Sequence, residues 1–206
     1  MNSSVYARPD KPRFMETYFR GRYKVKSDSF QISNPIELDK ATECHVTPLT
    51  VAKRMVEYSE VRNNSVLEPS AGTGNLIQAL LNDGNSEITA VEKNPELSRY
   101  LTNNFENIET INMCLLNYAN SYDRKKFPRI IMNPPFREVK KHISSAFSLL
   151  GLNGHFSANN TGPATLVALV PSNFDYPDAV TMERLNRNTF STTSVMTKII
   201  RIRRYI

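Results

Sequence analysis

The sequence predicts a doubly wound α/β fold with a mostly parallel sheet, and two observations carry this prediction. First, short apolar runs alternate with stretches of helical periodicity along most of the chain, and such alternation is typical of parallel sheets covered by helices. Second, an apolar run at 65–68 leads into a glycine turn and then into a helical stretch. Strand, glycine turn and helix together form the start of a βαβ unit.

The expected elements follow one another in a regular order. Thr47 and Pro48 begin a helix, because Thr can cap a helix and Pro suits its first position. Asn94 and Pro95 begin another in the same way, and Gly151 is expected to cap the helix that starts after residue 138. A polar, partly helical stretch is expected ahead of the final strand. The strands themselves are predicted at 65–68, 87–92, 108–113, 129–132, 164–170 and 196–205.

The 206 residues suffice for one domain, expected at 35–206, preceded by a basic N-terminal arm at 1–34. The arm interleaves basic with aromatic residues, which suits phosphate contacts and base stacking. It is equally consistent with a solvated segment that packs a few rings on the domain surface. The Leu152–Pro163 segment, rich in Gly, Asn and Ser, is expected to be a long loop.

Composition narrows the class of partner. The net charge is +6 and the isoelectric point lies near 9.3, which favours a polyanion such as nucleic acid. Cys44 and Cys114 are isolated, which favours a reducing cytoplasm and argues against a disulfide framework or a zinc site. No apolar run is long enough to span a bilayer, and we expect no membrane partner and no metal.

The tetrapeptide Asn133-Pro134-Pro135-Phe136 comes directly after the 129–132 strand. Two successive prolines cannot continue a strand, because each lacks an N–H and has a fixed φ. The strand must end there and leave an amide, a carbonyl and an aromatic ring at its carboxyl edge. That edge is where open α/β sheets bind ligands.

The sequence from Glu68 to Gly74, combined with the tetrapeptide at 133–136, resembles the S-adenosylmethionine-dependent adenine-N6 DNA methyltransferases. The similarity covers nearly everything from Thr47 to Arg204. It implies a Rossmann-like class I methyltransferase fold, with a seven-stranded sheet whose last strand is antiparallel. It further implies a DNA-binding enzyme that methylates the N6 amino group of adenine, with DNA favoured over RNA; the isolated cysteines favour a cytoplasmic location.

The resemblance also implies roles for individual residues. Thr47 and Pro48 would close over the methionine end of S-adenosylmethionine, and Glu92 would accept from the ribose hydroxyls. Asn133 and Pro134 would accept the two hydrogens of the target amino group, Pro135 would shape the turn, and Phe136 would stack on the base. The remaining residues expected at the cofactor are Glu68, Pro69, Ser70, Ala71, Gly72, Gly74 and Cys114.

The chain departs from the family pattern in two ways. Cys114 stands where family members usually place an acid beside the cofactor's adenine, and a neutral thiol is a weak hydrogen-bond partner. Family members associated with restriction commonly carry a target-recognition domain after the closing strand, and we expect none here. We therefore expect short or relaxed sequence specificity, supplied by the arm, the 152–163 loop or a partner chain.

Several alternatives stay open at this stage. The same Asn-Pro-Pro-aromatic chemistry serves RNA adenines and protein glutamine amides, and cytosine-N4 methylation uses related sites. A non-catalytic nucleic-acid-binding subunit would also retain the fold. Lys198, Arg201, Arg203 and Arg204 are consistent either with a solvated strand edge or with phosphate contacts.

Overall fold

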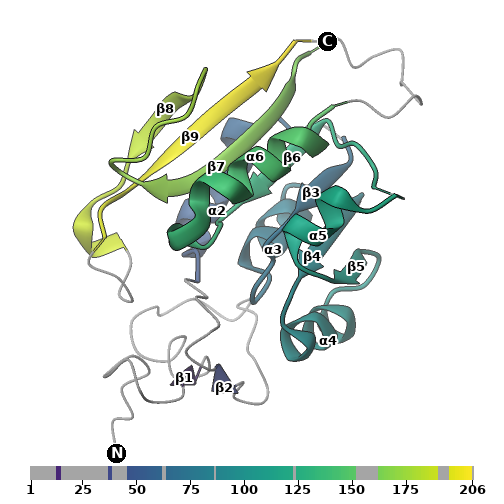
Figure 1. Cartoon of the computed structure of the whole chain (residues 1–206). Helices are drawn as coiled ribbons and strands as arrows, with labels where there is room; N and C mark the ends of the chain where they lie inside the picture. Colours follow the sequence, from purple (N-terminus) through teal and green to yellow (C-terminus); the bar gives the residue numbers. More distant parts are fainter. Residues whose placement is uncertain are drawn as a thin grey trace, which may run out of the picture. The chain divides into compact units, whose positions relative to one another are not determined.

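The computed structural model describes residues 13–14, 37–38, 46–61, 64–85, 87–122, 124–151, 162–189 and 195–205. The chain divides into two compact units, Met1–Cys44 and His45–Ile206 (Figure 1). In the first unit, β1 (Arg13–Phe14) pairs antiparallel with β2 (Glu37–Leu38). The rest of the predicted basic arm lies outside the described residues, as do Cys44 and most of the 152–163 loop. The predicted arm boundary at residue 34 stays a prediction.

The second unit is built on a seven-stranded sheet in the order β5-β4-β3-β6-β7-β9-β8. Its strands are β3 (Val66–Glu68), β4 (Ile88–Glu92), β5 (Glu109–Asn112), β6 (Arg129–Met132), β7 (Ala164–Pro171), β8 (Val180–Arg184) and β9 (Thr197–Arg204). The first five are parallel to one another, whereas β9 is antiparallel to both β7 and β8. The predicted fold class, including the antiparallel last strand, is confirmed.

Helices cover both faces of this sheet. They are α2 (Leu49–Ser59), α3 (Asn75–Asn82), α4 (Pro95–Asn104), α5 (Leu115–Asn120) and α6 (Val139–Leu149). Figure 1 shows α5 and α6 in front of the sheet and α2 and α3 behind it; α5 packs beside α6, and α2 beside α3. Two short 3-10 helices, η1 (Phe136–Glu138) and η2 (Arg187–Thr189), complete the unit. The strands supply both faces of the core, because Ile130 and Ile131 point to opposite sides and are both fully buried.

The helix ends show where local sequence signals act as expected and where they do not. The Asn94 side chain accepts from the backbone N–H groups of Glu96 and Leu97, which confirms the predicted cap. At α2 the cap residue is Pro48, the helix begins at Leu49 and no side chain caps it, so the predicted cap at Thr47 and first position at Pro48 are wrong. Gly151 does not take a left-handed conformation, and its N–H donates to the Phe127 carbonyl instead. The prediction of Gly151 as a C-cap is therefore wrong.

The polar stretch ahead of the last strand was expected to be partly helical, and this is wrong for 180–184. These residues form β8, the outer strand of the sheet, which pairs with β9 with an irregularity between Thr181 and Glu183. An edge strand keeps one side in water, so its residues need not be apolar. Among the described residues of this stretch, helical structure is limited to η2.

The basic residues of β9 make intramolecular contacts. Arg201 and Arg203 both reach Glu60 Oε1, at 3.3 Å and 2.5 Å. Arg204 donates to the Leu150 carbonyl and lies over the Phe147 ring. Among the described residues, no helix is both long enough and apolar enough to cross a membrane.

Candidate active site

The glycine turn and the proline tetrapeptide lie side by side at one edge of the sheet. β3 and β6 are hydrogen-bonded parallel neighbours, with Leu67 opposite Ile130. Parallel strands present their carboxyl ends at the same edge, so the turn after Glu68 and the turn after Met132 open in the same direction. Residues some sixty positions apart in the sequence are thereby brought into one site.

At two of its positions, the glycine turn has a backbone conformation that only glycine adopts readily. Gly72 and Gly74 have φ of 55° and 84°. The Ala71 N–H donates to the Val91 carbonyl at 3.1 Å, and the Gly74 N–H donates to the Ala71 carbonyl at 2.9 Å. These bonds fold the chain back on itself and tie it to β4 before α3 begins.

Glu92 closes the next strand and holds the glycine turn. Its Oε2 accepts from the Gly72 N–H at 2.8 Å, and its Oε1 accepts from the Asn94 N–H at 2.8 Å. The side chain is buried, and burial raises its pKa despite these bonds. A further backbone hydrogen bond comes from Lys93. A carboxylate has about four acceptor positions, so these bonds leave capacity for one ligand hydroxyl.

Glu68 ends β3 and is fully buried. Its Oε1 accepts from the Ser70 N–H at 3.0 Å, while its buried Oε2 has no hydrogen-bond partner among the described residues. Burial raises the pKa of this carboxyl well above its ordinary value, and the nearby Glu92 raises it further. A cation placed against Oε2 would relieve this electrostatic cost.

The tetrapeptide leaves β6 with its polar groups at the sheet edge. Pro134 is buried, whereas Asn133, Pro135 and Phe136 are each half-buried. Pro135 caps η1, and its carbonyl accepts from the Glu138 N–H at 3.3 Å. The Asn133 Nδ2 donates to the hydroxyl of Thr47 at 3.0 Å.

Thr47 and Pro48 lie buried just ahead of α2, where Pro48 accepts the first backbone bonds of that helix. The Thr47 carbonyl accepts from the Asn75 side chain at 2.8 Å. The sequence indicated neither this contact nor a site role for Asn75. The available signal was a polar residue that opens an otherwise apolar helix directly after Gly74.

The end of β5 forms the third part of the candidate site at this edge of the sheet. Asn112 donates its side-chain N–H to the carbonyls of Glu92 and Lys93, at 2.8 Å and 3.3 Å. Cys114 is half-buried and caps α5, and its carbonyl accepts from the backbone of Asn117 and Tyr118. Asn112 thus fixes β5 to β4 through its side chain.

The loop after β7 begins at this same edge and runs back toward α6. Phe174 and Tyr176 stack with ring centroids 6.3 Å apart, and Tyr176 lies at the same distance from Phe147 on α6. The buried Lys198 of β9 donates to the exposed Asp175 at 3.2 Å. The Lys198–Asp175 pair therefore lies near this edge, since Lys198 is opposite Val170. The rings instead lead along α6 toward Phe147, which lies under Arg204 opposite the start of β7.

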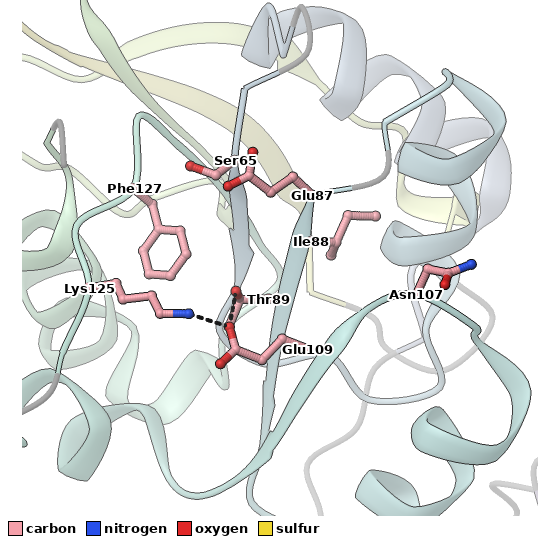
Figure 2. A pocket seen from close by; sticks show the side chains of 8 residues that line it. All are labelled: Ser65, Glu87, Ile88, Thr89, Asn107, Glu109, Lys125 and Phe127. Atoms are coloured by element: carbon pink, nitrogen blue, oxygen red, sulfur yellow. Dashed lines mark hydrogen bonds and ion pairs between the residues drawn. The ribbon is translucent and has the colours of Figure 1, made fainter. Parts of the chain in front are cut away.

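A pocket of about 210 Å³ lies at the opposite, amino-terminal edge of the sheet and is separate from this site (Figure 2). Three of the polar side chains that line it, those of Lys125, Thr89 and Glu109, bond to one another, as Figure 2 shows. The Lys125 Nζ and the Thr89 hydroxyl both donate to Glu109 Oε2 at 2.9 Å. The hydrogen bond from Lys125 is the main cause of the lowered pKa of Glu109.

Replacing Lys125 with Met should lower the free energy of unfolding by less than about 1 kcal/mol at neutral pH, because both paired side chains are about half exposed. The loss should vanish in acid. A carboxyl with a lowered folded-state pKa contributes stability above its unfolded-state pKa, and that contribution disappears as the pH falls through the folded value. Urea unfolding across this range, with Lys53→Met on the exposed face of α2 as control, measures the effect. A pH-independent loss would instead indicate packing of the lysine stem.

Comparison with known proteins places the fold in a family. The sequence pattern of the methyltransferase small domain matches residues 33–196, well over half of the chain. No curated protein sequence matches the chain significantly.

Several solved structures share the fold. A protein from Haemophilus influenzae described as a methylase has a TM-score of 0.57 at 15% identity, over 75% of this chain and 89% of that one. The 23S rRNA methyltransferase ErmE has a TM-score of 0.58 at 20% identity, over 79% and 70%. A protein from Pyrococcus horikoshii described as an RNA methyltransferase has a TM-score of 0.57 at 17% identity, over 79% and 88%.

The fold, its strand order and the extent of the family match agree. The chain belongs to the methyltransferase small domain family, and it is a class I methyltransferase that uses S-adenosylmethionine.

Proposed function

We propose that this methyltransferase acts on the exocyclic N6 amino group of adenine in nucleic acid. The observation that supports this most directly is the pairing of β3 with β6. It sets the glycine turn beside Asn133, so that a methyl donor on the turn and an amino group on the amide would meet at one edge. Holding two reactants in such a position accounts for a large part of catalysis in group transfer.

The tetrapeptide suits a planar amino group. The lone pair of an aromatic amine is delocalised into its ring, which makes the nitrogen a poor nucleophile. The Asn133 side-chain oxygen and the Pro134 carbonyl each accept one N–H hydrogen, and this holds the nitrogen toward the methyl group. Phe136 stacks on the base, and Pro135 offers no competing donor. Preorganised acceptors of this kind need no reorganisation during the reaction.

Buried carboxylates fit the cofactor's charge. Glu68 Oε2 is a buried acceptor with no partner among the described residues, and it would accept from the ammonium of the methionine part. Glu92 would accept from the ribose hydroxyls while it keeps the Gly72 N–H in place. Pro69, Ser70 and Ala71 would line the turn under the cofactor, Pro48 would close over it and Cys114 would border its adenine. When bound, the cofactor supplies an electrophilic methyl group.

Replacing Glu68 with Gln should weaken cofactor binding by about one to two powers of ten, since a hydrogen bond to a charged group is worth about 1.5–3 kcal/mol. Gln keeps an acceptor for the Ser70 N–H and removes the charge. Calorimetric titration with S-adenosylmethionine measures the change, and Glu57→Gln on the exposed side of α2 is the matched control. Unchanged affinity would remove Glu68 from the cofactor site.

The same substitution should alter how the stability of the cofactor-free protein depends on pH. Burial holds the pKa of Glu68 well above its ordinary value. Below the unfolded-state pKa of this carboxyl, the group is protonated in both the folded and the unfolded protein. As the pH rises from there through the folded-state pKa, stability is lost. Glu68→Gln should flatten this decline, which begins near the ordinary carboxyl pKa of about 4, in urea unfolding. An equal decline in both proteins would assign it to other groups.

RNA is the first polymer to test. ErmE is a 23S rRNA methyltransferase, and the Pyrococcus horikoshii protein is described as acting on RNA. DNA is the second candidate, because the motifs at 68–74 and 133–136 resemble the adenine-N6 DNA branch most. A base in an unpaired RNA loop is reached without opening a duplex, whereas duplex DNA must flip its base at a cost of a few kcal/mol.

The decisive experiment supplies labelled S-adenosylmethionine with total RNA, unmodified DNA and total protein in parallel. Digestion to nucleosides and mass spectrometry should find N6-methyladenosine or its deoxy form. N4-methylcytosine or methylglutamine as the main product would replace adenine in the proposal. Cofactor binding without transfer to any polymer would favour a regulatory subunit. Mapping the modified positions should reveal a short or relaxed site, and a long, strictly defined one for the isolated chain would contradict that expectation.

A further inference from the structure

A chain of two hydrogen bonds joins the glycine turn to Asn133. Asn75, the first residue of α3, follows Gly74 directly and donates from Nδ2 to the Thr47 carbonyl at 2.8 Å. The hydroxyl of that same Thr47 accepts from Asn133 Nδ2 at 3.0 Å. Three elements that are distant in the sequence, the starts of α2 and α3 and the end of β6, therefore meet at one threonine.

Burial makes both bonds structurally significant. Thr47 is 5% exposed and Asn75 is 9% exposed. A buried polar group that loses its partner costs roughly 1–3 kcal/mol, so both side chains are held in the observed positions. An exposed threonine could exchange its contact for water, but this one cannot do so without rearrangement.

The hydrogen bond to Thr47 restrains both the nitrogen and the oxygen of the Asn133 side-chain amide. The nitrogen and oxygen of an amide lie on opposite arms of a single plane. Once Nδ2 is bound to the threonine hydroxyl, rotation about the last side-chain bond is restricted and the direction in which the oxygen accepts is set. A residue that removes this freedom contributes to preorganisation although it does not touch the reacting atoms.

We infer that Thr47 is a positioning residue. It orients the Asn133 amide for the target amino group and links that orientation, through Asn75, to the cofactor turn. This inference rests on the proposed function, and it differs from the expectation that Thr47 only closes over the cofactor. Thr47 should therefore affect the rate of methyl transfer rather than the affinity for the cofactor.

Two substitutions separate the hydroxyl from the shape of the side chain. Thr47→Val keeps the branched shape and removes the acceptor, whereas Thr47→Ser keeps the acceptor and removes a methyl group. We expect the single-turnover rate of Thr47→Val to fall by about 10- to 100-fold, the usual effect of removing an orienting partner. Thr47→Ser should retain most of the rate, and both variants should bind S-adenosylmethionine within about twofold of the unchanged protein.

A double substitution tests whether the threonine acts through the amide. In an Asn133→Ala background there is no amide to orient, so adding Thr47→Val should not lower the rate further. An additional loss of the same size as in the single variant would show independent action and overturn the inference. So would a wild-type rate in Thr47→Val, an equal defect in Thr47→Ser, or a loss of cofactor affinity that accounts for the whole effect.

A readout that does not depend on activity keeps this test apart from the proposed function. In nitrogen-15 spectra, the side-chain amide protons of Asn133 should exchange with water faster in Thr47→Val than in Thr47→Ser. If the unchanged protein methylates no nucleic acid, the proposed function fails, and this exchange measurement still decides whether Thr47 fixes the amide. If methylation occurs but the exchange rates are equal, only the positioning role is overturned.

Discussion

Replacing Asn133 with Ala should reduce methyl transfer by about 10²–10³-fold, the effect of removing one preorganised hydrogen-bonding group from a site of developing charge. Cofactor binding should be nearly unchanged, because Asn133 follows β6 whereas the cofactor turn follows β3. Single-turnover rates and calorimetric titration with S-adenosylmethionine measure the two quantities separately. The substitution should lower the rate of methyl transfer rather than the affinity for the cofactor, since the amide holds the amino group that receives the methyl group.

Asn82→Ala is the matched control, since it removes an exposed asparagine amide at the end of α3. Urea unfolding should show that both variants remain folded, although Asn133→Ala also removes the bond to Thr47. Full activity in Asn133→Ala would exclude the tetrapeptide from catalysis. Equal losses of rate and affinity would indicate that the substitution disturbs the whole sheet edge.

The parts of the fold that sequence predicted best are those set by local signals. A strand, two glycines and an apolar helix between 65 and 81 leave few alternatives for the backbone, and the adjacent prolines at 134–135 end a strand wherever they occur. Asn94 and Pro95 predicted a helix start for the same reason. In each case the deciding interactions lie within about five residues of one another.

The parts that sequence missed depend on residues far apart in the chain. Nothing local distinguishes β8 from a polar loop, because an edge strand is stabilised by its partner β9 rather than by its own apolar pattern. The Thr47–Asn133 bond spans 86 positions and the Asn75–Thr47 bond spans 28. Such contacts follow from the assembled sheet, and no pattern in either short segment indicates them.

Gly74→Ala should be the most destabilising of the substitutions considered, for two additive reasons. Gly74 has φ of 84°, a left-handed conformation that costs an alanine about 1–2 kcal/mol. A Cβ at this position would also lie 2.4 Å from Cε2 and 2.6 Å from Cζ of the Phe105 ring. Overpacking of that kind costs about 1–3 kcal/mol more. Urea unfolding should therefore show a loss of about 2–5 kcal/mol.

Gly84 provides a matched control within the same protein. Its φ is 83°, nearly that of Gly74, but a Cβ there would meet nothing within 4 Å. Gly84→Ala should therefore show the backbone cost alone, about 1–2 kcal/mol. Equal losses in the two variants would mean that the Phe105 ring moves aside without cost and that steric contact contributes nothing at Gly74.

A second substitution at the ring tests the steric term directly. Phe105 is buried at the end of α4, so Phe105→Leu alone should be destabilising. Combined with Gly74→Ala, it should cost less than the sum of the two single changes, because the shorter side chain leaves room for the added Cβ. Gly74→Ala should also weaken S-adenosylmethionine binding, since the clash presses the glycine turn away from α4. If Phe105→Leu relieves the clash, it should restore part of that affinity. Recovery of stability without recovery of affinity would place the functional requirement in the backbone conformation of Gly74 itself, independent of its packing against α4.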